Sequence, residues 1–184
     1  MRLFLVLLFA AAAQAQLLDL THLDRLDTKA RESTQVKLDD SKLKLASQFL
    51  GDKGAEGARN AVANLKGVYV RSFEFDSKGS YTEADLEPIR KQLKADKNWS
   101  NFIMHKEDNE VSEIWFHKQP DGAMGGLAII AAEDRELTVV NIVGPLNASS
   151  LGQLGGLGIP NLGGILGDAG IKKEPRAPRK TNEE

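Results

Sequence analysis

Cysteine is absent from the 184 residues, and aromatic residues make up only 6% of them. A chain without cysteine has no disulfides, no thiolate metal ligands, no cysteine nucleophile and no cysteine for an N-terminal lipid anchor. Basic residues are also scarce relative to acidic ones, at 24 against 26, which gives a net charge of −2. This balance argues against a nucleic-acid partner, which needs a basic surface.

The only long uncharged apolar run near the N-terminus is too short to cross a membrane. It extends over eleven residues from Leu3 to Ala13, whereas a membrane-spanning helix needs roughly 20. A positive start, Met1-Arg2, precedes it, and small residues at Ala13 and Ala15 follow. This pattern predicts a signal peptide over residues 1–15, cleaved between Ala15 and Gln16, and therefore a periplasmic or secreted protein. An uncleaved anchor or a buried helix is the alternative.

Residues 16–32 form a leucine-rich segment, called the lead-in here. Leu20, Leu23 and, less squarely, Leu26 fall along one stripe of a short helix, with Asp19 and Asp24 outward. This spacing predicts a helical arm that packs on the core. A helix that docks on a partner is the alternative.

Residues 33–147 have the pattern of one α+β domain. Strand-like segments alternate with two helical regions in the first half, and four strand-like segments follow one another in the second. We therefore expect a single, largely antiparallel sheet of about five to six strands with helices on one face. The expected strands are 34–38, 68–75, 101–106, 111–118, 123–132 and 137–143, and the expected helices are 41–50, 55–65 and 82–93.

The expected sheet is unusual because its last strands are apolar on both faces. Residues 127–132 and 139–143 lack the alternation typical of a strand with one wet face. Helices can cover only one face, so the lead-in, the tail, another subunit or a ligand must cover the second. The uncovered apolar residues would form an interaction surface for another envelope protein or for self-association, and the sequence leaves the oligomeric state open. Its expected members are Phe102, Met104, Trp115, Ile129 and Val140. In the expected hairpin over residues 101–118, Ile103 and Ile114 fall on one face, whereas Phe102 and Trp115 fall on the other.

The C-terminal residues 148–184 form a tail of different composition. Residues 151–171 contain eight glycines and a single charged residue, Asp168, whereas residues 172–180 contain five basic side chains and two prolines. So much glycine disfavours a helix and predicts a flexible tail. Apolar residues beside a basic run are also compatible with weak contact to an anionic membrane surface.

No constellation of residues predicts a catalytic, cofactor-binding or metal-binding site. In a hairpin over residues 101–118, His105 and His117 point to opposite faces, and no zinc, phosphate-loop or nucleophile motif occurs. Only a carboxylate pair of the kind used by glycosidases remains open, so enzymatic activity is uncertain and not favoured. The best isolated polar candidate is Arg71, which could contact an anion. The alternative is an arginine at the edge of the core, paired with Glu74 or Asp85.

Three stretches resemble one protein family. They are residues 44–50 (KLASQFL), residues 65–76 (LKGVYVRSFEFD), and the run from GGLAIIAAE at 125–133 to LTVVNIVGP at 137–145. In this order behind a signal peptide, they resemble the bacterial exported family catalogued as domain of unknown function 4252, from about Thr34 to Leu146. The resemblance implies a bacterial envelope or secreted protein, without an agreed activity, cofactor or catalytic residue.

These observations lead to one hypothesis of function and two alternatives. The leading hypothesis is a non-catalytic binding or interaction module of the bacterial envelope, without a cofactor. The first alternative is a membrane-peripheral protein attached through its Gly/Leu-rich and basic tail. The second is a hydrolase that acts on envelope glycan through two carboxylates.

Overall fold

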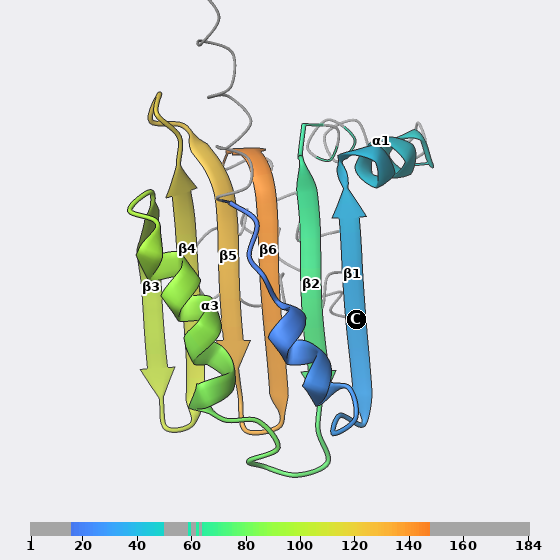
Figure 1. Cartoon of the computed structure of the whole chain (residues 1–184), viewed down its shortest axis with the longest axis vertical. Coiled ribbons are helices and arrows are strands. Elements are labelled where there is room, and N and C mark those ends of the chain that lie inside the picture. The colour runs from blue at the N-terminus through green and yellow to red at the C-terminus, as the bar shows by residue number, and fades with distance from the viewer. Residues whose placement is uncertain (1–15, 50–58, 60–61, 63, 148–184) are drawn as a thin grey trace, which may run out of the picture.

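The structure is a computed structural model, and it describes residues 16–49, 59, 62 and 64–147. Its centre is one six-stranded antiparallel sheet with the order β1-β2-β6-β5-β4-β3 (Figure 1). The α+β class and the single antiparallel sheet predicted from the sequence are thereby confirmed. The strands are β1 (Glu32–Asp39), β2 (Gly67–Glu74), β3 (Trp99–Glu107), β4 (Glu110–Lys118), β5 (Met124–Ala132) and β6 (Glu136–Leu146).

The order of the strands follows from two simple connections. Strands β3 to β6 form a meander in which each strand pairs with the next. Strand β6 then pairs with β2, which pairs with β1. This arrangement makes β1 and β3 the two edge strands and puts the most apolar strands, β5 and β6, in the interior of the sheet. Interior strands are buried on both faces, which explains why these two do not alternate.

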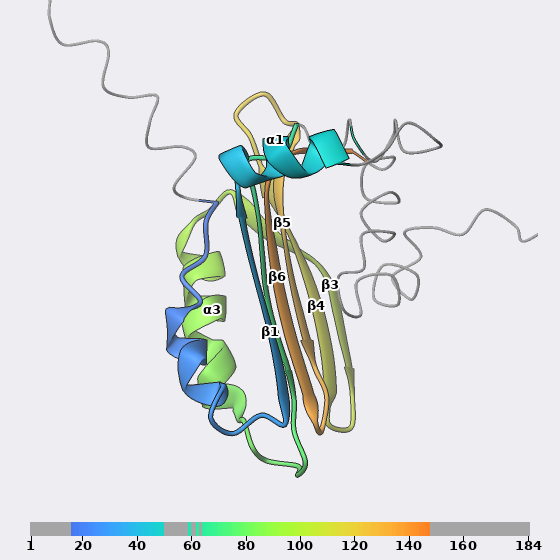
Figure 2. The ribbon, with the colours of Figure 1, turned by 90° about the vertical axis from the view of Figure 1, so that its right-hand side faces the viewer.

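Two helices cover the same face of the sheet (Figure 2). They are α3 (Glu83–Ala95) and the 3₁₀-helix η1 (Thr21–Leu26) of the lead-in. Helix α1 (Asp40–Phe49) directly follows β1 and lies at one end of the sheet. The predicted helix at 55–65 falls mostly outside the described residues.

Helix α3 begins with the capping pattern that the sequence predicts. The Asp85 carboxylate accepts a hydrogen bond from the backbone N–H of Thr82 at 2.8 Å, which satisfies a donor that the first turn leaves free. Its apolar stripe, Leu86, Ile89 and Leu93, is at most 1% exposed. The helix is therefore held both by its cap and by its buried face.

The sheet separates two apolar clusters. The cluster on the helix-covered face joins α3 and the lead-in to the sheet, and it includes Leu23, Leu26, Phe73, Ile89, Trp115, Ile130 and Val139. The cluster on the opposite face, called the second face here, includes Val68, Val70, Ile114, Leu127, Ile129, Val140 and Ile142. Leu43 of α1, Val62 and Leu65 also belong to it. The lead-in lies beside α3 on the helix-covered face. It therefore does not cover the second face, which was one of the possibilities that the sequence left open.

The hairpin of β3 and β4 departs from the expected faces at one residue. Ile103 and Ile114 lie opposite each other on the second face, as predicted, but the register shifts between Asn101 and Ile103. This bulge turns Phe102 toward Phe116 on the second face, with the ring centroids 5.2 Å apart. Its predicted position on the face of Trp115 is therefore wrong, because one extra residue reverses the alternation.

Candidate functional site

The lead-in forms a 3₁₀-helix, not the α-helix that a mixed spacing of three and four would give. Leu20, Leu23 and Leu26 are three residues apart, and a 3₁₀-helix puts such residues on one line. Leu23 and Leu26 are fully buried. Leu26, the least well placed on an α-helical stripe, is thus as central to the packing as Leu23, and the prediction that the lead-in packs on the core is confirmed.

A single side chain of β6 fastens the start of the lead-in. The amide oxygen of Asn141 accepts a hydrogen bond from the N–H of Leu18 at 3.0 Å, and its amide nitrogen donates to the carbonyl of Gln16 at 3.1 Å. Asn141 is completely buried. A buried amide with both ends bonded to one segment fixes the path of that segment across the sheet.

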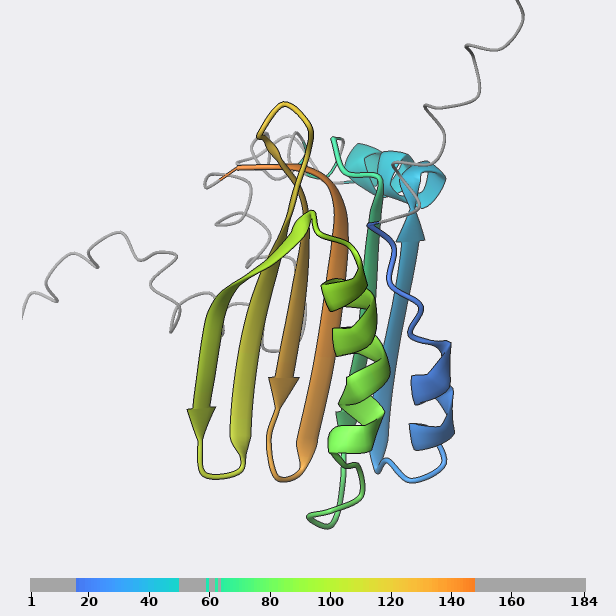
Figure 3. The same ribbon diagram turned by 60° about the vertical axis from the view of Figure 1, so that its left-hand side comes forward.

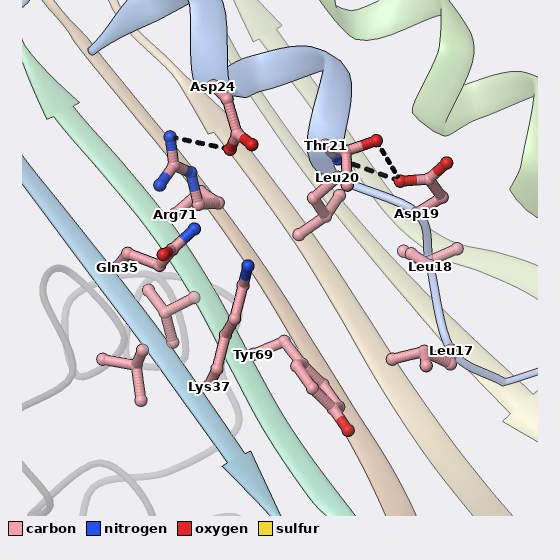
Figure 4. A pocket seen from close by; sticks show the side chains of 12 residues that line it. Leu17, Leu18, Asp19, Leu20, Thr21, Asp24, Gln35, Lys37, Tyr69 and Arg71 are labelled. Carbon is pink, nitrogen blue, oxygen red and sulfur yellow. Dashed lines mark hydrogen bonds and ion pairs between the residues drawn. The ribbon is translucent and has the colours of Figure 1, made fainter.

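A cavity of about 360 Å³ lies between the lead-in and the first two strands. Figure 3 shows the ribbon of the lead-in beside β1, and Figure 4 shows the side chains that line the cavity. Leu17, Leu18 and Leu20 form its apolar wall, and side chains of β1 and β2 form its floor. The volume lies within the range of small-molecule binding sites, and so does the combination of apolar walls with a few polar groups.

The polar groups of the floor come from adjacent positions on two paired strands. Gln35 lies opposite Arg71, and Lys37 lies opposite Tyr69. Side chains at opposite positions of an antiparallel pair are about 5 Å apart at Cβ, and diagonal neighbours are about 7 to 8 Å apart. The strand register thus brings four polar side chains together beneath the leucines of the lead-in.

Arg71 is the most deeply buried of these four residues, with an exposed fraction of 4%. Its guanidinium donates to Asp27 at 2.9 Å, lies 3.4 Å from Asp24, and stands over the ring of Phe73 at 4.8 Å. Its Nε is buried without a hydrogen-bond partner in the described part of the chain. A buried donor without an acceptor is costly for the folded state.

Arg71 pairs with neither Glu74 nor Asp85, the two partners expected from the sequence. Glu74 is three positions away on the same strand and therefore points to the opposite face, where it pairs with Arg31. Asp85 pairs with Arg25 of the lead-in. Two lead-in carboxylates take the arginine because the lead-in, and not α3, lies over β2.

The acids around the cavity are already bonded within the chain. Hydrogen bonds from Thr21, first from its hydroxyl and then from its backbone N–H, lower the pKa of Asp19. The hydrogen bond from Arg71 lowers the pKa of Asp27, and burial opposes it only in part. These carboxylates therefore stay charged. The ammonium of Lys37, in contrast, is exposed and forms no ion pair with the described residues.

The five residues of the expected interaction surface do not come together. Phe102 and Met104 are 65% and 58% exposed on the edge strand β3. Trp115 is buried on the helix-covered face, whereas Ile129 and Val140 are fully buried on the second face. The interior strands β5 and β6 bury their residues on both faces, so only the β3 pair remains accessible.

A second cavity, of about 330 Å³, lies where α3 begins and contains several acids. Asp134 pairs with Lys78 and Glu83 pairs with Arg90, so both carboxylates already neutralise cations. Burial, followed by the neighbouring Glu136 and Glu110, raises the pKa of Glu133. Burial also raises the pKa of Tyr81, whose hydroxyl donates to the carbonyls of Glu133 and Glu136.

The histidines lie apart. His22 contacts the carbonyl of Asp85, His105 is exposed on β3, and His117 contacts Asp96 at 3.2 Å. Within residues 16–49, 59, 62 and 64–147, no cluster of three or more His, Asp or Glu side chains could hold a metal ion. Within these same ranges, no helix is both long and apolar enough to span a membrane. The predicted signal peptide and tail lie outside the described residues.

Sequence reasoning identified Arg71 but missed the other cavity residues. Gln35, Lys37 and Tyr69 were recognised only as alternating positions of strands, because their common location depends on which strands pair. The alternation of polar 35 and 37 with apolar 36 and 38 was the available signal. It shows that 35 and 37 share a face, and it does not show that Tyr69 and Arg71 lie beside them.

Comparison with known proteins identifies the family. The model of the family described as "Domain of unknown function (DUF4252)" matches residues 28–154. No curated protein and no solved structure matches the chain. The matched range begins near the end of the lead-in and contains all six strands, and it confirms the resemblance noted in the sequence. The chain belongs to the DUF4252 family, a family of domains of unknown function.

Proposed function

We propose that this protein is a non-catalytic binding module of the bacterial envelope, and that the cavity between the lead-in and β1–β2 takes a small apolar ligand. The observation that carries the proposal is a space of about 360 Å³ with a leucine wall and a polar floor. Export is supported by the apolar run at residues 3–13 and the small residues at 13 and 15.

The way in which the wall is held supports a binding role. The lead-in is anchored at both ends, by Asn141 at Leu18 and by the buried Leu23 and Leu26. Gln92 of α3 also accepts a hydrogen bond from the N–H of Asp19 at 2.7 Å. A preformed site loses little conformational entropy when a ligand enters, which favours affinity.

Binding of a neutral fluorescent probe, N-phenyl-1-naphthylamine, to the full-length protein tests this proposal. Gln35 is exposed and lines the cavity, so Gln35→Trp should fill it without disturbing the core. We expect Gln35→Trp to abolish the fluorescence rise of the bound probe. The matched control is Lys106→Trp, an exposed position on the same face of the other edge strand. Equal probe binding by both variants and the wild type would contradict the proposal.

A second candidate function is self-association through the edge strand β3. Phe102 and Met104 are large apolar side chains with exposed fractions above one half, and in the described sheet β3 pairs with β4 alone. An exposed edge strand can pair with the same strand of a second copy about a two-fold axis, which extends the antiparallel sheet.

Light scattering of the double variant Phe102→Ser/Met104→Ser tests this second candidate. We expect the wild type to dimerise and the variant to be a monomer. Leu45→Ser is the control, because Leu45 is 55% exposed on α1, away from the β3 edge. A monomeric wild type, or a dimer that survives the double substitution, would reject the candidate.

A further inference from the structure

We infer that the ligand of this cavity is an amphipathic monocarboxylate of the size of a medium-chain fatty acid, with its carboxylate between Lys37 and Arg71. The inference rests on the proposed binding function and adds the chemistry of the ligand. Two cations of the lining carry it: the guanidinium of Arg71, which is 4% exposed, and the ammonium of Lys37, which has no ion-pair partner among the described residues.

The two donors are placed to share one carboxylate. Arg71 and Lys37 are diagonal neighbours on paired strands, since Gln35 is opposite Arg71 and Lys37 is opposite Tyr69. Diagonal neighbours are about 7 to 8 Å apart, a gap that a carboxylate with its two oxygens bridges when long side chains lean toward it. Figure 4 shows the side chains of Lys37, Gln35 and Arg71 directed into the space below the lead-in.

The charges of the lining sum to zero, but one cation, Lys37, has no partner among the described residues and favours a ligand with one negative charge. The lining contains two cations, Lys37 and Arg71, and two acids, Asp19 and Asp24. Arg71 is paired with Asp24 and Asp27, and Thr21 donates two hydrogen bonds to the Asp19 carboxylate, so Lys37 is the charged group of the lining whose side chain has no partner among the described residues. A phosphate monoester carries nearly two charges at neutral pH and would leave one facing the acids. A cationic ligand would meet Lys37 itself.

The remainder of the lining is suited to an alkyl chain. Leu17, Leu18 and Leu20 form one wall, and the ring of Tyr69 lies at the end of the floor away from Arg71 (Figure 4). At the packing density of protein interiors, the cavity has room for roughly 12 to 15 non-hydrogen atoms. A saturated chain of medium length with one carboxylate fills such a space, whereas a membrane phospholipid is far too large.

Isothermal titration of the full-length protein with dodecanoate, dodecanol and dodecyltrimethylammonium, all below their aggregation concentrations, tests the inference. We expect dodecanoate to bind at least about tenfold more tightly than dodecanol, because a hydrogen bond to a charged group contributes roughly that factor. The cationic amphiphile should bind most weakly.

Variants of the two donors assign the effect to this site. Lys37→Met should lower the affinity for dodecanoate about tenfold and leave that for dodecanol unchanged. Lys106→Met, on the same face of the other edge strand, is the control and should change neither. Arg71→Lys keeps the charge and removes the planar guanidinium, so it should also weaken dodecanoate binding selectively.

The outcomes separate this inference from the proposed function. Equal affinities for dodecanoate and dodecanol, or a Lys37→Met variant that still prefers dodecanoate as much as the wild type does, would overturn the inference that the ligand carries a carboxylate. The cavity would then remain a site for apolar ligands. If the wild-type protein binds none of the three amphiphiles and does not bind the neutral probe, the binding function itself is overturned. A preference for the cationic amphiphile would overturn the assignment of charge.

Discussion

The helix-covered face of the sheet has two halves that are built on the same plan with opposite results. In the α3 half, the sheet residue Glu113 pairs with Arg90 of the helix at 2.6 Å, and Glu113 is fully buried. In the lead-in half, the sheet residue Arg71 pairs with Asp24 and Asp27 of the lead-in, whose side chains are 54% and 40% exposed. One half is closed around its ion pair, and the other opens onto a cavity.

This difference distinguishes a buried charge that only stabilises the fold, Glu113, from one that can also contact a ligand, Arg71. Glu113 also accepts a hydrogen bond from the indole of Trp115 at 2.9 Å, so both of its oxygens are used inside the core. Arg71, in contrast, lines a space of about 360 Å³. A longer, thirteen-residue α-helix fills the first half, whereas a six-residue 3₁₀-helix leaves the second half incompletely filled.

The largest effect is expected from breaking the closed ion pair. Glu113→Ala leaves Arg90 and the indole N–H of Trp115 without their buried acceptor, and it should lower the free energy of unfolding by about 3 to 5 kcal/mol. Urea unfolding followed by tryptophan fluorescence measures it. The double variant Glu113→Leu/Arg90→Met should recover most of the loss. A loss below about 1 kcal/mol would show that this half is not closed.

The next effect concerns the anchor of the lead-in. Asn141→Leu removes the acceptor of the Leu18 N–H and the donor to Gln16, and it should cost about 2 kcal/mol, the penalty of leaving buried polar groups unpaired. Because the lead-in is the wall of the cavity, the variant should also lose probe binding. Unfolding and titration with N-phenyl-1-naphthylamine check both effects. Retained probe affinity would mean that Asn141 does not hold the wall.

Alanine substitutions at two glycines, one in each half, allow the packing of the two halves to be compared. A Cβ at Gly126, in the closed half, would stand 3.1 Å from the carbonyl oxygen of Ile142, and backbone cannot move aside easily. The three atoms nearest to a Cβ at Gly67 all belong to the outer end of the Tyr69 side chain, the first at 2.5 Å, and that side chain can turn. We expect Gly126→Ala to cost about 1 to 2 kcal/mol, as overpacking does, and Gly67→Ala to cost less. Gly67→Ala should instead change probe affinity. Equal stability losses by urea unfolding would contradict the comparison.

The smallest effect is expected for the Arg71–Asp27 ion pair, through the pH dependence of the free energy of unfolding. The hydrogen bond from Arg71 lowers the pKa of Asp27 below its ordinary value of 3.8. A carboxylate with a lowered pKa in the folded state stabilises the fold above its unfolded pKa, and this contribution is lost as the pH falls through the folded value. Asp27→Asn should therefore cost about 0.5 kcal/mol at pH 7, a figure typical of an exposed pair. Urea unfolding from neutral pH to about pH 3 should show the difference from wild type shrinking; a constant difference would reject this account.

Local patterns foretold most of the elements. The alternation in β1, the apolar runs of β5 and β6, and the Thr82–Asp85 cap each depend on residues close together in the chain. A turn at Asp108-Asn109 predicts that His105 pairs with Ser112 and His117 with Ser100; the first pairing is confirmed, and the second is wrong because the bulge puts His117 opposite Trp99. Where a single residue broke the local rule, as at the bulge of Phe102, the predicted face was wrong for that residue.

The sequence by itself determined the secondary structure, the single antiparallel sheet, the burial of Leu20, Leu23 and Leu26 and the membership of the DUF4252 family, because these follow from short-range pattern and composition. Only the tertiary structure decided that β2 lies between β1 and β6, and that the lead-in lies over β2. Those long-range pairings bring Lys37 beside Tyr69 and give Arg71 two lead-in carboxylates. The cavity arises from them because a short 3₁₀-helix cannot fill the space above two strands.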